Sequence, residues 1–93
     1  MTTKFISLLG MCRKAGKVLL GVEELQKIAS RVRIAFVACD ASERTKKNIQ
    51  ESGVPLFVTD MTKKELGAVL GCGEVAVASV ADANFAQALQ KNI

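Results

Sequence analysis

Ile34-Ala35-Phe36-Val37-Ala38-Cys39 is the longest uninterrupted apolar run in this chain of 93 residues. A strand with one solvated face alternates apolar and polar side chains, whereas a strand covered on both faces is apolar throughout. The run therefore predicts a central strand with helices packed against both sides of its sheet.

Before this strand the sequence alternates between helical and extended patterns. Apolar residues recur at helical spacing over 4–15, which predicts a first helix. A short apolar strand follows at 17–20 and ends at Gly21. A second amphipathic helix then begins at Val22 and turns Leu25 toward the core.

After the central strand, helices are expected over 40–52, over 62–71 and from 82 onward, with strands over 56–58 and 74–80. The first two of these helices open on a capping box, in which a polar residue is followed three positions later by Glu. The expected capping residues of the three helices are Asp40, Thr62 and Asp82.

Alternation of helix and strand builds a mostly parallel or mixed sheet between helical layers. No internal repeat and no linker rich in Ser, Pro or Gly divides the chain. We therefore expect an α/β fold, a three-layer α/β/α sandwich with a four-stranded mixed sheet, formed by residues 1–93 as a single domain.

The composition is typical of a globular protein, with 49% hydrophobic and 24% charged residues. No apolar run approaches the roughly 18 residues of a membrane span. The first residues lead into an amphipathic segment rather than a signal peptide. These features predict a cytoplasmic protein with no membrane partner, and we expect a monomer.

The chain lacks the residues on which most metal sites and disulfide frameworks depend. It contains no His, and its three cysteines are odd in number and form no closely spaced pair. We expect no metal, no cofactor and no disulfide. The cysteines are interpreted as reduced thiols at core or near-core positions, namely Cys12, Cys39 and Cys72.

The sequence gives little support to the hypothesis that this protein is an enzyme. Asp40 and Asp60 each follow a predicted strand, as the carboxylates of phosphoacceptor domains do, but helix capping explains both. Cys72 has no His to act as its base, and no Gly-rich loop of the P-loop type is present. We therefore predict that the protein is not an enzyme.

The basic residues are concentrated in the first half of the sequence. Residues 1–47 contain ten Lys and Arg against four Asp and Glu, whereas residues 48–93 contain three against five. A basic half on a small domain indicates a polyanionic partner such as nucleic acid, although a solvated basic surface would look the same.

The segment Gly21-Val22-Glu23-Glu24-Leu25-Gln26-Lys27 gives the clearest indication of a binding site. A glycine before a helix lets the backbone approach a ligand closely, and the first N–H groups of a helix attract phosphate. Glu24, Lys27 and Arg31 are spaced to share one exposed helix face. Such a carboxylate can accept hydrogen bonds from guanine while the cations contact phosphates, but an ordinary exposed face with intrahelical ion pairs fits equally.

A second segment of interest runs from Leu66-Gly67-Ala68-Val69-Leu70-Gly71 through the loop Cys72-Gly73-Glu74 to Val75-Ala76. A glycine inside a helix costs roughly 1 kcal/mol relative to alanine, so Gly67 is expected to have a packing or contact reason. The loop after this helix could close over an unstacked base. Close packing of the helix on the sheet is the alternative.

At these segments the sequence resembles the kink-turn RNA-binding superfamily of ribosomal proteins, of the "seven-Ae" and "thirty-e" large-subunit type, and its small bacterial members in particular. The family signature Gly-x-Asn-Glu-x-x-Lys is matched by residues 21–27. The resemblance covers nearly the whole chain, and its further matches are Val54-Pro55, Leu66-Gly67-x-x-x-Gly71, the strand ending at Val80 and the helix entry Asp82-Ala83-Asn84-Phe85-Ala86.

This resemblance implies an α/β/α sandwich that binds RNA. It implies that Glu24 and Lys27 contact the tandem sheared G·A pairs of a kink-turn, and that the loop at 72–76 packs against the bulged nucleotide. Glu23 stands where the family has Asn, and a carboxylate only accepts hydrogen bonds whereas an amide also donates them. The expected RNA-binding residues are Gly21, Val22, Glu23, Glu24, Lys27, Arg31, Cys72, Gly73, Glu74, Val75 and Ala76.

The expected function is therefore non-enzymatic binding of structured, kink-turn-like RNA in a ribosomal or ribosome-associated protein of translation. All four aromatic residues lie at predicted core positions, so no platform is expected for stacking single-stranded bases. They are Phe5, Phe36, Phe57 and Phe85. The alternative is a protein-interaction module that docks on a translation factor or ribosomal protein and binds RNA weakly or not at all, which Glu23 favours.

Overall fold

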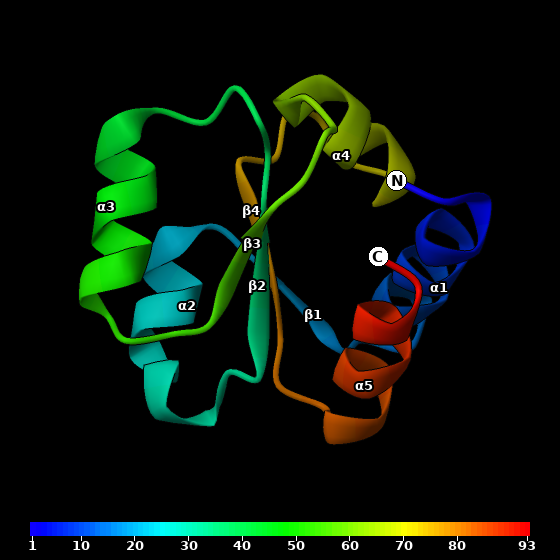
Figure 1. Ribbon diagram of the computed structural model, residues 1–93, viewed down its shortest axis with the longest axis horizontal. Helices are drawn as coiled ribbons and strands as arrows, with labels where there is room; N and C mark the ends of the chain where they lie inside the picture. Colours follow the sequence, from blue (N-terminus) through cyan, green and yellow to red (C-terminus); the bar gives the residue numbers. More distant parts are fainter.

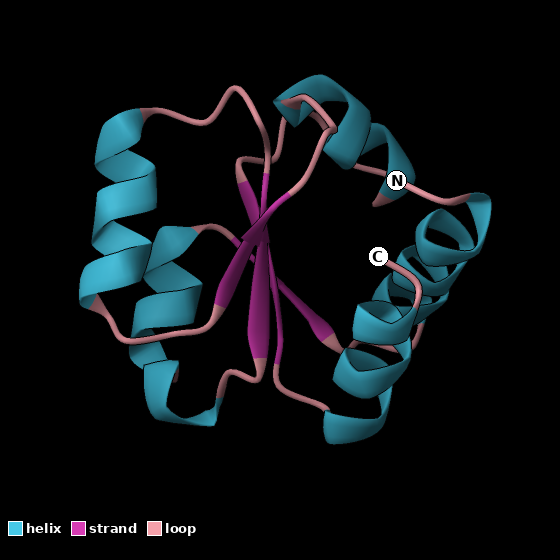
Figure 2. Cartoon of the chain, viewed as in Figure 1, coloured by secondary structure: helices cyan, strands magenta, loops and turns pink.

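The computed structural model describes residues 1–93, in which five α-helices surround a four-stranded sheet (Figure 1). The elements are α1 (Thr3–Lys14), β1 (Val18–Leu20), α2 (Val22–Lys27), the 3₁₀ turn η1 (Ala29–Arg31), β2 (Ile34–Val37), α3 (Glu43–Glu51), β3 (Leu56–Val58), α4 (Lys63–Val69), β4 (Val77–Val80) and α5 (Ala83–Lys91). Helices α2 and α3 cover one face of the sheet, and α1, α4 and α5 lie on the other side (Figure 2). The predicted three-layer α/β/α sandwich is confirmed.

The sheet is mixed, as predicted, with the strand order β1-β4-β2-β3. Strands β2 and β3 are parallel, whereas β4 is antiparallel to both of its neighbours, β1 and β2. Every residue of β2 and β4 is buried. This burial explains the continuous apolar run at Ile34–Val37, because both faces of a central strand pack against helices.

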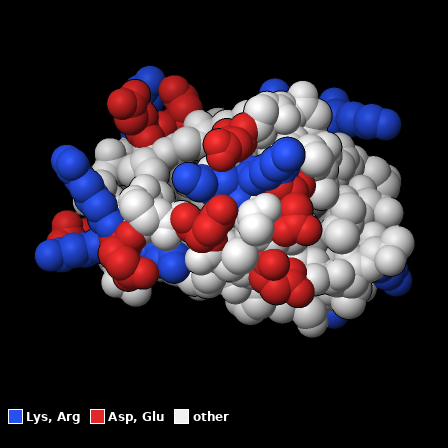
Figure 3. Space-filling model, turned by 90° about the horizontal axis from the view of Figure 1, so that it is seen from above, with Lys and Arg blue, Asp and Glu red and all other residues white.

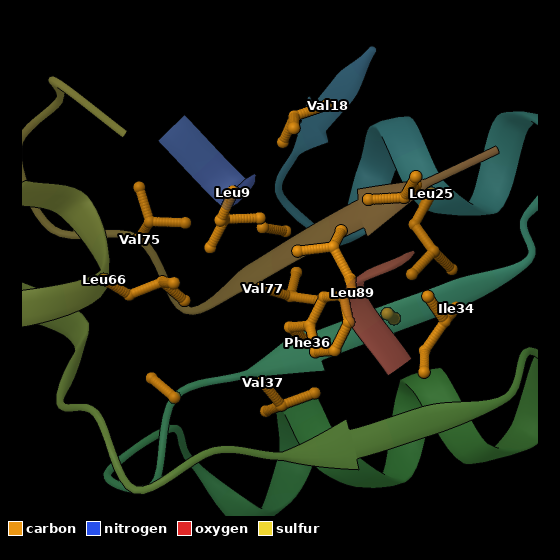
Figure 4. Close-up of a cluster of buried hydrophobic side chains, with 14 of the residues drawn as sticks. Leu9, Val18, Leu25, Ile34, Phe36, Val37, Leu66, Val75, Val77 and Leu89 are labelled. Atoms are coloured by element: carbon orange, nitrogen blue, oxygen red, sulfur yellow. The ribbon is translucent and has the colours of Figure 1, made fainter. Parts of the chain in front are cut away.

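The core is one cluster of 23 buried apolar residues centred on the sheet. Phe36 stacks edge-to-face with Phe5 at 5.0 Å and with Phe57 at 6.4 Å between ring centroids. Leucines from four helices point toward the sheet, as Figure 4 shows for Leu9, Leu25, Leu66 and Leu89. Phe5 and Phe36 are fully buried, and Phe57 and Phe85 are partly buried against the same cluster. The prediction that no aromatic ring is free at the surface agrees with this packing.

Two of the three predicted helix caps are confirmed. Thr62 and Glu65 form a complete capping box at the start of α4. The Asp82 carboxylate accepts a hydrogen bond from the Phe85 backbone N–H at 2.9 Å and so caps α5. These side chains satisfy N–H groups that have no partner within the helix.

The predicted capping box of Asp40 with Glu43 is wrong. The residue that caps α3 is Ser42, whose hydroxyl accepts from the Thr45 N–H at 3.1 Å. The Asp40 carboxylate instead accepts from the Lys63 N–H at 2.8 Å, at the first residue of α4. Asp40 therefore joins the loop after β2 to a helix that begins far along the sequence.

Asp60 is not a helix cap either. Both of its carboxylate oxygens lie 2.7 Å from the Met1 amino group. Hydrogen bonding to this ammonium group lowers the pKa of Asp60 below its usual value.

Two further expectations are corrected by the structure. Cys39 is exposed, because β2 ends at Val37 before reaching it, whereas Cys12 is buried and Cys72 partly buried. The last strand begins at Val77 rather than at residue 74, because residues 74–76 form a loop whose Val75 N–H donates to the Lys63 carbonyl at 3.0 Å. None of the helices is long and apolar enough to cross a membrane.

Candidate functional site

The two segments that the sequence singles out meet at one end of the sheet. Because β1 and β4 are antiparallel, the end of β1 lies beside the start of β4. The Gly21 N–H donates to the Val77 carbonyl at 3.1 Å, and the Ala38 N–H donates to the Ala76 carbonyl at 2.8 Å. Residues 21–27 and 72–76 thus adjoin at the end where β1, β2 and β3 finish, which points upward in Figure 1 and is called the carboxyl end below.

Gly21 is the turning point between β1 and α2. Its φ of +90° is a conformation that residues with a side chain rarely adopt, and no atom lies within 4 Å of where its Cβ would be. The backbone conformation, not crowding, therefore requires glycine here. The open space in front of Gly21 also leaves the backbone accessible to a ligand.

Helix α2 is shorter than the sequence indicates. It ends at Lys27, because Ile28 has φ −128° and ψ 32° and leaves the helical conformation. Arg31 therefore belongs to the 3₁₀ turn η1, and the prediction that it shares one helix face with Glu24 and Lys27 is wrong. Arg31 lines a groove beside Arg33 at the opposite end of the sheet.

Glu24 and Lys27 do lie on one face and form an ion pair at 3.1 Å, with 50% and 68% of their side chains exposed, respectively. An exposed pair of this kind contributes about 0–1 kcal/mol, so a ligand can rearrange it at little cost. Both side chains are reachable from solvent, as a binding site requires. The pair also shows that the alternative interpretation of this spacing, an exposed helix face with an intrahelical ion pair, describes the protein without a ligand.

The start of α2 is a poor phosphate site. The helix has only six residues, and Glu23 and Glu24 occupy its first turn. Their negative charges oppose an incoming phosphate, although they complement the helix dipole. These two exposed carboxylates are instead suited to accept hydrogen bonds from donor groups such as the N–H edges of bases.

The loop after α4 is held against that helix at Gly67. A Cβ at Gly67 would overlap the Gly73 carbonyl, and the Cys72 N–H donates to the Gly67 carbonyl at 2.8 Å. The predicted packing reason for this glycine is confirmed. The loop also borders an open groove of about 570 Å³, whose lining residues are Lys64, Ala68, Cys72, Gly73 and Glu74.

Two cations at this groove were not singled out by the sequence. Lys64 lines it from α4, and the Arg13 guanidinium reaches from α1 to within 3.8 Å of the Cys72 sulfur. No motif marks either residue. Arg13 reaches the loop because α1 packs against α4, and Lys64 lies on α4, the helix that precedes the loop. The groove consequently combines cationic, small and acidic residues.

The carboxyl end is not uniformly basic. Figure 3 looks onto this end and shows Asp and Glu side chains interspersed with Lys and Arg. The acidic residues placed here by the strand ends, the adjoining loops and the helix starts are Glu23, Glu24, Asp40, Glu43, Asp60, Glu65 and Glu74. Electrostatic attraction alone therefore does not direct a polyanion to this surface. The structure also contains no group of three or more His, Cys, Asp or Glu residues that could hold a metal ion.

No family model matches the chain, and no curated protein matches it. Solved structures do match. One of them is a protein of unknown function from Bacillus halodurans, which is 29% identical, covers 97% of this chain and 96% of its own, and superimposes with a TM-score of 0.84. The chain is therefore similar over nearly its whole length to a protein of unknown function.

Proposed function

We propose that this chain binds a structured RNA of the kink-turn type at the carboxyl end of its sheet and catalyses no reaction. One observation supports this proposal above the others. Residues 21–27 carry the family signature, and the resemblance assigns the bulged nucleotide to the loop at 72–76. These two segments adjoin there, because the Gly21 N–H donates to the carbonyl of Val77, the residue that follows this loop. The proposed site is thus one continuous edge.

Each part of this edge has a distinct role in the proposal. Glu24 accepts hydrogen bonds from the N–H groups of guanines in sheared G·A pairs, and Lys27 contacts an adjacent phosphate. The backbone approaches RNA closely at Gly21, where no side chain intervenes. The groove beside Cys72 and Gly73 receives an extrahelical nucleotide.

The test measures the affinity of two variants at a fixed salt concentration, for a kink-turn RNA and for the same RNA with its G·A pairs replaced by Watson–Crick pairs. Lys27→Ala is expected to weaken kink-turn binding, and Glu24→Ala to reduce the preference for the RNA that contains G·A pairs. Lys91→Ala is the control, because Lys91 is also exposed but belongs to α5. Unchanged affinity and preference in both variants would reject the site.

A protein-interaction module is the second candidate, and the carboxylates of the carboxyl end favour it. Acidic side chains repel RNA phosphates but suit a basic segment of a protein partner. The two candidates differ in salt dependence, because log affinity for RNA falls with log salt concentration by about 0.7–0.9 per phosphate neutralised. The second candidate predicts that the chain binds no RNA and captures a basic ribosomal protein through Glu23 and Glu24.

A further inference from the structure

We propose that the opposite end of the sheet holds a second RNA-binding surface, where Lys17, Arg31 and Arg33 bind the phosphates of an RNA duplex. This surface is called the basic end. It does not depend on the recognition of a kink-turn by the carboxyl end. The first reason for the proposal is the sheet register, which gathers basic residues from separate strands.

Val80, the last residue of β4, pairs with Val18 of β1 on one side and with Ile34 of β2 on the other. The residues that precede these partners, Lys17 and Arg33, therefore flank Ala81 from both sides. Neighbouring strands are about 4.8 Å apart, so the backbones at Lys17 and Arg33 are about 10 Å apart. The small, uncharged Ala81 leaves the space between the two cations open.

The third cation, Arg31, joins them through a groove. A hollow of about 730 Å³ is lined by Ser30, Arg31, Val32, Arg33, Pro55 and Ala81. A second hollow of about 300 Å³ shares Ala81 with it and includes Lys17. The two hollows therefore adjoin at Ala81, and together they are called the depression below.

These cations are not neutralised within the protein. Lys17, Arg31 and Arg33 are exposed, and none belongs to the three ion pairs of the structure. Asp82 is the one carboxylate that lines this depression, so the three cations outnumber the acidic residues there. The depression therefore presents free positive charge, whereas Lys27 and Lys46 are each paired with a glutamate.

The chemistry of the depression favours phosphate over a protein segment. Two arginines offer forked N–H groups that match phosphate oxygens, and the charges follow the end of a rigid sheet. Protein interfaces are anchored by large apolar or aromatic side chains in pockets. The larger hollow is lined by no aromatic side chain, and its apolar lining consists of Pro55, Ala81 and the buried Val32.

The experiment titrates the protein with a plain RNA duplex that lacks G·A pairs and follows fluorescence anisotropy at several salt concentrations. The double variant Arg31→Ala/Arg33→Ala is expected to lose about tenfold in affinity, and the slope of log affinity against log salt is expected to fall by about 1.5, as for two lost phosphate contacts. The matched control is Arg44→Ala/Lys47→Ala, two exposed cations of α3. The control should remain within about twofold of the original chain at the same salt.

A second variant tests the geometry rather than the charge count. Ala81→Glu places a carboxylate between Lys17 and Arg33 and should weaken duplex binding at least as much as the double variant. Gln87→Glu, exposed on α5, adds the same charge elsewhere and should have little effect. Thermal unfolding of each variant shows whether it is folded.

Three results would overturn the inference: no duplex binding by the original chain, equal loss in the control pair, or binding of polyglutamate through the same residues without binding of duplex RNA. The last result would assign the surface to an acidic protein segment. The kink-turn proposal fails separately, because Glu24→Ala and Lys27→Ala leave the basic end intact. Loss of kink-turn preference with retained duplex binding would reject only the site at the carboxyl end.

Discussion

The two ends of the sheet differ in how their charges are used. At the carboxyl end, carboxylates are numerous and Lys27 and Lys46 are already paired with glutamates. At the basic end, Lys17, Arg31 and Arg33 are unpaired around a depression. The net charge of +4 therefore says little about where a polyanion is attracted. In our proposal the carboxyl end recognises the edges of RNA bases and the basic end attracts RNA phosphates, so the two tasks are carried out by separate surfaces.

The largest effect is expected from disrupting the carboxyl end at Gly67. Gly67→Ala adds a Cβ where the Gly73 carbonyl lies, so the loop at 72–76 must move away. We expect a loss of about 1–3 kcal/mol in the free energy of unfolding, as for other overpacked sites. Kink-turn binding should fall by tenfold or more, while binding of plain duplex at the basic end stays unchanged. Urea denaturation and anisotropy titrations measure the two effects.

Gly10→Ala is the matched control for this prediction. Gly10 also lies inside a helix, α1, but its Cβ would meet only the Val69 carbonyl at 3.8 Å, an ordinary contact. Alanine is favoured over glycine in a helix by up to about 1 kcal/mol, so this variant should be slightly more stable. Equal destabilisation of both variants would contradict the assigned role of Gly67.

A smaller, opposite effect is expected at Glu23. Glu23→Asn removes a charge that opposes phosphate and supplies a hydrogen-bond donor. We expect kink-turn affinity to rise about fivefold, equivalent to about 1 kcal/mol, with no change for plain duplex. Glu51→Gln removes the same charge from an exposed position at the end of α3 and should leave both affinities unchanged. A weaker kink-turn complex for Glu23→Asn would favour the protein-interaction candidate.

The smallest effect concerns the cysteines, of which Cys39 and Cys72 lie at the carboxyl end. Burial, with the nearby negative charge of Asp82, raises the pKa of the Cys12 thiol to about 11. Cys12 is therefore protonated at pH 8 and should resist alkylation, whereas exposed Cys39 should react first. Kink-turn RNA should slow the alkylation of Cys72 severalfold and plain duplex should not, as measured by mass spectrometry. Equal protection by both RNAs would contradict separate binding surfaces.

Much of the fold was predictable from local pattern. The unbroken run at Ile34–Val37 predicted a strand buried on both faces, and Thr62 with Glu65 predicted the start of α4, because both signals depend on short-range geometry. The role of Asp40 was not predictable in this way. Asp40 and Ser42 both suit a helix cap, and only the distant Lys63 N–H decides between them.

The candidate site was predictable only in part, because Arg31 lies at the opposite end of the sheet and Arg13 and Lys64 were not singled out. Gly21 was singled out as the turn from a strand into a helix, and Gly67 as an unfavourable residue inside a helix, and the structure shows that both positions require glycine. The short extent of α2 was not predictable, because the apolar spacing continues through Ile28 and only its backbone conformation ends the helix. The distant position of Arg31 follows from that early end. The pairing of Glu24 with Lys27 follows instead from their i,i+3 spacing, which is already present in the sequence.

The central claim is tested most directly by mapping backbone amide shifts of the labelled protein during titration with a kink-turn RNA. Our account predicts that the largest changes fall together on Gly21 to Lys27 and Cys72 to Ala76, and that a plain duplex shifts Lys17, Arg31 and Arg33 instead. Changes confined to the basic end for both RNAs, or absent at Gly21 and Gly73, would contradict it.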